Sequence, residues 1–327
     1  MSDMNGVVFS DLLGLSEPLT KLIETVSCGV GMVYKPIHIK RMAKAKAEEI
    51  KLISDTVADN ILLPVKYSDG AVSVDSTDVV ELANRAKNRF LFQQIKKQQN
   101  IESVISNAYA ELETHAVASS TPVDDNWVSA FFDSVANVSD SQMQEIWGKL
   151  LAGEIIQPGR YSLRTLDTLK HLTTREANLF VKMEPYFLNC PSNAGDEFFP
   201  DDYFIPALNS LGKYNISFHK IAILADAGIF VENMGVTVGC IISAKSTGYI
   251  NYYEKPVLQL ENTSSQTIAA SRHAYVLSSV GSELLSLIRT NTNQIRNDEY
   301  LKECAMFFSK KEYSNEPLEN CVVTILP

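Results

Sequence analysis

The sequence lacks the clustered cysteines and histidines from which proteins build metal and redox sites. Its 327 residues include five cysteines, which are scattered and form no Cys-x-x-Cys pair. The five histidines also stand far apart, without a His-Glu-x-x-His motif. These spacings favour reduced, buried cysteines and structural histidines over metal ligands. We therefore expect no metal and no cofactor.

Motifs of catalysis, export and membrane insertion are missing as well. There is no phosphate-binding Gly-x-x-x-x-Gly-Lys-Ser/Thr loop and no Gly-x-Ser-x-Gly nucleophile elbow, and Gly29-Val-Gly31 lacks the third glycine of a dinucleotide motif. The first twenty residues lack the basic start and apolar core of a signal peptide. No apolar run approaches the roughly 18 residues of a membrane span. The sequence predicts a soluble, cytoplasmic protein that is not an enzyme.

Basic residues are scarce outside the first third of the chain. The net charge is -10, yet residues 1–100 carry 13 basic and 12 acidic side chains. The remainder is strongly acidic and should repel phosphate backbones at long range. Any contact with nucleic acid should therefore come from the first third.

A basic segment within that third predicts one long helix that begins near Pro36 and ends near Asn60. Pro36 suits a first helical turn, and strong helix formers follow it. The segment is a solvated helix on one interpretation and an arm for a protein partner, RNA or anionic lipid on the other. The candidate contact residues are Lys35, Lys40, Arg41, Lys44 and Lys46.

A linker or short turn is predicted between Leu62 and Thr77, where Pro64 and Asp69-Gly70 occur. Helical periodicity resumes at Asp78, and we expect two helices that meet near Gln99-Asn100. The residues spaced for burial on these helices include Leu82, Ala86, Phe90, Val104, Ile105 and Tyr109.

Four punctuated helices are predicted between residues 121 and 188. Asp124 and Asp125 can cap the first of them, and Ser139 or Asp140 can begin the second. Thr173 and Glu176 form a capping-box pattern at the fourth. Trp147 lies on an apolar helix face and is expected in the core, and an ion pair between Glu154 and nearby arginines (Arg160, Arg164) is expected to fix the turn at Pro158-Gly159.

Beyond residue 189 the pattern changes to a mixed one. An acidic loop is followed by a short helix that ends at Gly228, then by strands near 236–243, 248–253, 256–260 and 275–277, and by a helix from Ser278. This order resembles a winged helix with an enlarged wing. Its third helix offers only His219 and Lys220 to a DNA groove, which disfavours base readout.

The predicted fold class is mainly α with a smaller α+β part. The expected domains are an amino-terminal helical arm and hairpin (1–120), a central helical bundle (121–188) and a winged-helix-like carboxy-terminal domain (189–327). Long amphipathic helices indicate a homo-oligomer.

The segment WGKLLAGEIIQPGRYSLRTL, from Trp147 to Leu166, followed by LTTREA from Leu172, resembles the bacterial family called domain of unknown function 2806 (DUF2806). The resemblance implies no catalytic residues. Its Trp-x-x-Leu-Leu-Ala part is also distantly similar to abortive-infection alpha proteins, which implies a role in defence against phage. The residues of this family-motif block are Trp147, Leu150, Leu151, Gly153, Glu154, Pro158, Gly159, Ser162, Leu163 and Arg164.

Three functions remain open from the sequence. The first is a non-enzymatic helical sensor or interaction protein in phage defence, with a protein partner from the same locus or from the phage. The second is a winged-helix regulator that binds nucleic acid through Lys40, Arg41, Lys44 and the wing, which we favour less. The third is a nuclease built on acidic residues assembled from the loop that contains Asp196, Glu197, Asp201 and Asp202.

Overall fold

The computed structural model divides the chain into two compact units, Met1–Leu166 and Asp167–Pro327. It describes residues 15–31, 66–68, 71–73, 78–190, 197–200, 216–231, 236–252, 255–289, 297–309 and 320–327. The expectation of a mainly helical chain with a smaller antiparallel β part is confirmed. The helix predicted from Pro36 to Asn60 lies outside the described residues.

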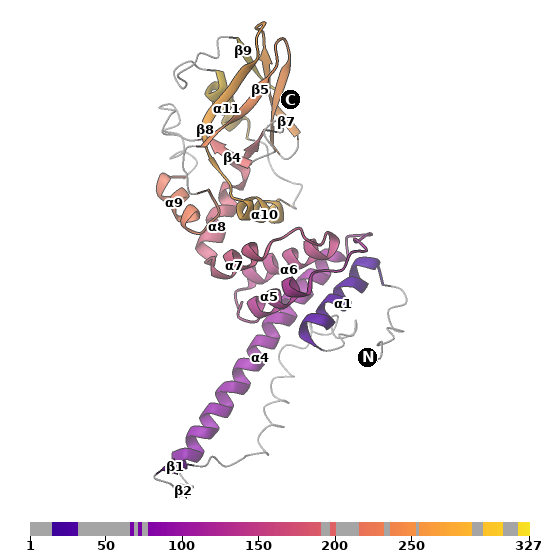
Figure 1. Ribbon diagram of the computed structural model, residues 1–327, viewed down its shortest axis with the longest axis vertical. Helices are drawn as coiled ribbons and strands as arrows, with labels where there is room; N and C mark the ends of the chain where they lie inside the picture. Colours follow the sequence, from indigo (N-terminus) through magenta and orange to yellow (C-terminus); the bar gives the residue numbers. More distant parts are fainter. Residues whose placement is uncertain are drawn as a thin grey trace. The chain divides into compact units, whose positions relative to one another are not determined.

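The first unit consists of helices and one small hairpin (Figure 1). Its elements are α1 (Glu17–Val30), β1 (Lys66–Ser68), β2 (Ala71–Ser73), α4 (Asp78–Leu112), α5 (Asp125–Val135) and α6 (Ser141–Ile156), and α7 (Leu163–His171) begins near its end. The segment predicted as a linker thus contains two antiparallel strands, β1 and β2. The second half of α4 packs against α1, α5 and α6.

Helix α4 is continuous over 35 residues, so the predicted break near Gln99-Asn100 is wrong. Neither residue is a helix breaker, because only proline and glycine carry a large penalty in a helix interior. The Asn100 side chain explains the polar interruption: its Nδ2 donates to the carbonyl of Ala136 at 2.9 Å and to Ser139 Oγ at 3.3 Å. A buried amide therefore joins α4 to the turn between α5 and α6.

The predicted helix starts of the central segment are confirmed. Asp124 accepts a hydrogen bond from the backbone of Trp127, and Asp140, rather than Ser139, caps α6 through the backbone N–H of Met143. Thr173 forms the complete capping box with Glu176 at the start of α8 (Thr174–Met183). These side chains satisfy backbone donors that the first turn of a helix leaves without partners.

An aromatic cluster forms the core of the first unit. The ring of Phe131 stacks on Trp127 at a centroid distance of 5.2 Å and meets the edge of Trp147 at 5.6 Å. Close by, Gly148 allows α6 to approach α4, because a Cβ at this position would lie 2.5 Å from the Cβ of Asn107. The predicted burial of Trp147 is confirmed, since its side chain is fully inaccessible.

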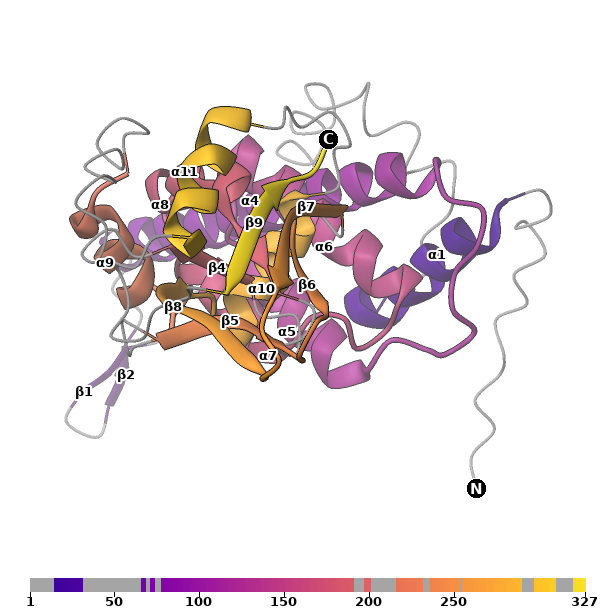
Figure 2. The ribbon, with the colours of Figure 1, turned by 90° about the horizontal axis from the view of Figure 1, so that it is seen from above.

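The second unit packs helices around a seven-stranded antiparallel sheet. After α8 come a short 3-10 helix (Glu184–Tyr186), β3 (Leu188–Asn189), β4 (Glu197–Pro200), α9 (Phe218–Asp226), β5 (Val236–Ile242), β6 (Thr247–Tyr252), β7 (Lys255–Asn262), β8 (Ile268–Val276), α10 (Ser279–Ile288), α11 (Asp298–Ser309) and β9 (Cys321–Ile325). The strand order is β5-β8-β4-β3-β6-β7-β9. Helix α11 packs on the sheet against β7, β8 and β9 (Figure 2).

The predicted strands are confirmed in position, with two corrections. The acidic segment expected to be a loop contains β4, which pairs with β8 through Phe198 and Val276. The strand expected at 275–277 is the end of the longer β8. Pairing between strands distant in the chain creates both features, and short-range patterns do not contain that information.

A buried ion pair stabilises the second unit. Arg289 Nε lies 3.2 Å from Glu184 Oε1, and a second guanidinium nitrogen donates to the carbonyl of Phe187 at 3.1 Å. Nearby, the Tyr300 hydroxyl donates to the carbonyl of Tyr186 at 2.7 Å. Burial, followed by the negative charge of Glu184, raises the pKa of Tyr252 to about 12.

The cysteines differ in exposure. Cys190, Cys240, Cys304 and Cys321 are buried as expected, whereas Cys28 is exposed, which corrects the prediction for that residue. Burial raises the pKa of the Cys304 thiol to about 12. In the part of the chain that the structure describes, no helix combines the length and the apolar character required to cross a membrane.

Candidate functional site

The family-motif block forms the core of the first unit and one turn. Trp147, Leu150 and Leu151 are buried on α6. Gly153 makes room for Tyr161, because a Cβ there would lie 2.7 Å from the tyrosine hydroxyl. The block therefore offers little surface to a partner, and the main contribution of its buried residues is to the stability of the first unit.

Glu154 fixes the turn after α6 through backbone groups. Its carboxylate accepts hydrogen bonds from the N–H of Gly159 at 2.5 Å and of Tyr161 at 3.0 Å, and the residue is almost completely buried. Gly159 has a φ of 82°, a conformation that favours glycine. The guanidinium of Arg160 lies over the Tyr161 ring, 5.3 Å from its centroid, instead of forming the predicted ion pair.

The exposed members of the block lie at the start of α7. Leu163 and Arg164 are exposed, while Ser162 is partly buried and its hydroxyl accepts a hydrogen bond from the backbone of Thr165. Pro158 is partly buried in the preceding turn. The other predicted contact residues, Lys35, Lys40, Arg41, Lys44 and Lys46, lie outside the described residues.

The first half of α4 carries exposed side chains. Figure 1 shows it extending beyond α1, α5 and α6. Leu82, Phe90 and Phe92 are 59%, 60% and 68% exposed, whereas Val104 and Ile105 in the second half are fully buried. The expectation that Leu82 and Phe90 would be buried is therefore wrong, because periodicity identifies a face that can be buried and not whether another element covers it.

Five exposed residues of this half lie along one line, which we name the α4 stripe: Leu82, Arg85, Arg89, Phe92 and Lys96. Their spacings of three and four residues place them on one face of a helix. The stripe alternates an apolar side chain with cations, with Phe92 between Arg89 and Lys96. The helical spacing of these residues is visible in the sequence, but their exposure is not, because the same spacing also fits a buried face.

The stripe lies on a locally basic helix. Asp78–Lys97 contains five basic and two acidic residues, a net charge of +3, which leaves -13 for the rest of the chain. Arg85 forms an exposed ion pair with Glu81 at 3.1 Å. Such exposed pairs are weak and are screened by salt, so the three cations of the stripe remain accessible to an anionic partner.

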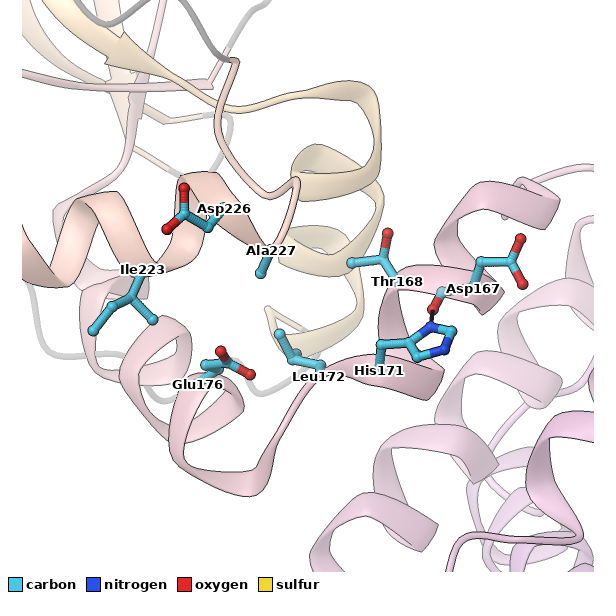
Figure 3. A pocket seen from close by; sticks show the side chains of 8 residues that line it. All are labelled: Asp167, Thr168, His171, Leu172, Glu176, Ile223, Asp226 and Ala227. Atoms are coloured by element: carbon cyan, nitrogen blue, oxygen red, sulfur yellow. Dashed lines mark hydrogen bonds between the residues drawn. The ribbon is translucent and has the colours of Figure 1, made fainter.

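A pocket of about 460 Å³ is present in the second unit, between α8, α9 and the end of α7 (Figure 3). Asp167, His171, Glu176 and Asp226 are among the residues that line it (Figure 3). The Nδ1 of His171 is hydrogen bonded to the carbonyl of Asp167 at 2.7 Å.

One carboxylate of the pocket is already engaged in a helix cap. Glu176 already accepts two hydrogen bonds of 2.7 Å from Thr173, as part of the capping box. Among the described residues, no group of three or more His, Cys, Asp or Glu side chains could hold a metal ion. Of the acidic residues considered for a nuclease, Asp196, Asp201 and Asp202 lie outside the described residues, and Glu197 lies in β4.

Together, these features define a class of protein: a helical unit that contains a basic helix with exposed side chains, and an α+β unit built on an antiparallel sheet. The chain belongs to the family described as Protein of unknown function (DUF2806), which matches residues 84–304. The matched range includes the α4 stripe from Arg85 onward. No curated protein and no solved structure matches the chain.

Proposed function

We propose that this chain is a non-enzymatic interaction protein that acts in bacterial defence against phage and binds its partner through the α4 stripe. The observation that carries the proposal is the exposure of two large apolar side chains, Leu82 and Phe92, among three cations on a helix whose second half contributes Val104 and Ile105 to the core. Exposed apolar residues grouped with cations are typical of binding surfaces. The defence setting rests on the resemblance of the Trp147 block to abortive-infection proteins.

The geometry favours the α4 stripe over the two other surfaces considered. The family-motif block is largely buried, so a change there acts first on stability. The pocket in the second unit presents three carboxylates, one of which already caps a helix. A winged-helix mode of DNA binding through α9 has little support, since this helix carries Asp226 and buries Ile221 and Leu224.

A phage challenge tests this proposal. The chain, expressed with its native neighbours, is compared with a stripe variant in which Arg85, Arg89 and Lys96 are all glutamine. A matched control carries Gln94→Ala, an exposed position on the same half of α4 that lies two residues after Phe92 and therefore on the other side of the helix. All three proteins should unfold at the same temperature, because surface changes of this kind shift stability by only about 0.5 kcal/mol.

We expect wild type and control to reduce plaque counts and the stripe variant to lose that protection. Equal protection by the stripe variant would exclude the stripe as the docking surface. A folded wild-type protein that protects against no phage in a broad panel would contradict the defence role.

A further inference from the structure

We infer that the α4 stripe binds single-stranded nucleic acid, either DNA or RNA. The inference rests on the proposed function, because it takes the stripe to be the docking surface. It adds the chemical class of the partner. The anionic backbone would contact the cations of the stripe, and a base would stack on Phe92.

The cations of the stripe are spaced along the helix as a chain of phosphates requires. At about 1.5 Å of rise per residue, Arg85 and Lys96 are separated by roughly 16 Å along the axis, with Arg89 between them. A polyanion can contact all three at once, whereas a single carboxylate or phosphate cannot. The remainder of the chain carries a net charge of -13, and its long-range repulsion of the same polyanion favours binding at basic segments such as this one.

Phe92 gives the stripe a preference for unpaired bases. Its ring is 68% exposed and lies on the same face as Arg89 and Lys96. An exposed aromatic side chain between two cations is the arrangement by which proteins stack bases while they hold the backbone. Bases inside a duplex are already stacked on one another, so the ring contributes to single strands and not to duplexes.

Two other occupants fit the stripe less well. A membrane would require the apolar side chains to share one face, but Phe90 and Phe92 are two positions apart and therefore about 200° apart around the helix. A second copy of the chain would place like charges opposite one another, which opposes pairing of two stripes. The charge and the separation of the phenylalanines thus favour a flexible polyanion that carries bases.

Phe90 supplies a matched control for the test. It lies on the same helix half as Phe92, is 60% exposed and belongs to the opposite side. Binding of the full-length protein to fluorescent single-stranded DNA and RNA of about 20 nucleotides is measured by anisotropy, with a hairpin duplex and anionic phospholipid vesicles as comparison probes.

We expect Phe92→Ala to weaken binding to the single strands roughly fivefold to a hundredfold, the range typical of one lost base stack, and Phe90→Ala to change it less than about twofold. Three phosphate contacts predict a slope of about -2 when the logarithm of the binding constant is plotted against the logarithm of the salt concentration. The double change Arg89→Gln and Lys96→Gln should reduce the magnitude of this slope to below about 1.

Three results would overturn the inference. Absence of binding to either single strand at low salt would do so directly. If wild type, Phe90→Ala and Phe92→Ala bind the single strands with equal affinity, no base stacks on Phe92. The same conclusion would follow if the wild type bound the duplex as tightly as the single strands. Vesicle binding that is weakened equally by both phenylalanine changes would assign the surface to a membrane.

The failure of this inference and that of the proposed function give different results. If the stripe variant loses phage protection while the wild type binds no oligonucleotide, the docking role stands and the partner has another chemistry. If the oligonucleotide binds as expected while the stripe variant still protects, the nucleic-acid site stands and the proposed role of the stripe in defence fails.

Discussion

Trp147 allows a direct test of what the family-motif block does. Its side chain is fully buried against Phe131, and its Nε1–H reaches no acceptor among the described residues. Truncation to alanine should cost about 3–5 kcal/mol of folding free energy, as for other buried aromatic residues. The loss would come from packing alone, because no hydrogen bond is removed.

Replacement of Trp147 by phenylalanine separates packing from polarity. It removes two buried carbons, which lowers the free energy of unfolding by about 1.6 kcal/mol at roughly 0.8 kcal/mol for each carbon. It also removes a buried N–H without a partner, which relieves a penalty of about 1–3 kcal/mol. The two terms are of opposite sign and similar size, so Trp147→Phe should lie within about 1 kcal/mol of the wild type.

Chemical denaturation followed by tryptophan fluorescence measures both variants. Trp127 and Trp147 are the two tryptophans of the chain, and both belong to the first unit. Trp127 remains as the reporter in each variant and lies beside Phe131. If phenylalanine destabilises the unit as much as alanine does, Nε1 donates a hydrogen bond in solution, and the packing explanation is refuted.

Three further changes test other parts of the structure. Arg289→Met leaves the Glu184 carboxylate buried without its cation and should lower the free energy of unfolding, measured in urea, by about 3–5 kcal/mol. Glu184→Leu in the same chain should recover most of this loss, and an unchanged stability of Arg289→Met would show that the pair is solvated. Because the raised pKa of Tyr252 favours its neutral form in the folded state, stability should be complete below pH 10 and fall as pH rises toward 12. Tyr252→Phe should reduce that alkaline loss in circular-dichroism melts, and an unchanged pH profile would exclude Tyr252 as a cause. Gly148→Ala should lower the melting temperature, because overpacking against Asn107 costs about 1–3 kcal/mol whereas the higher helix propensity of alanine contributes at most about 1 kcal/mol. A higher melting temperature would show that α4 and α6 can separate without cost.

Features decided within one helical turn could be predicted from the sequence. The capping box at Thr173 and the caps at Asp124 and Asp140 depend on residues three positions apart. The burial of Trp147 follows from the apolar face of a short helix. The positions of the strands between 236 and 262 also follow from local composition.

Features that depend on distant partners could not be predicted. The position of Asn100 within α4 is explained by its hydrogen bonds to Ala136 and Ser139, which lie far from it in the sequence. Phe90 fits a burial pattern, but its side chain is 60% exposed. The sequence predicts an ion pair for Glu154, whereas its carboxylate accepts hydrogen bonds from two backbone N–H groups. In each case tertiary contacts override a local signal.

The candidate site was partly within reach of the sequence. The first third of the chain was expected to hold any nucleic-acid contact, and the stripe lies there. The particular residues were missed because the periodicity of α4 was interpreted as a buried face. The helical spacing of Arg85, Arg89 and Lys96 could have indicated a second, basic face of the same helix.

The central claim is that the α4 stripe meets the partner, and photo-crosslinking in infected cells tests it most directly. A photoreactive phenylalanine analogue is placed at Phe92 in one protein and at Phe90 in another. The account predicts a nuclease-sensitive crosslinked product from position 92 and none from position 90. Equal crosslinking from both positions, or none from position 92 in a folded protein, would contradict it.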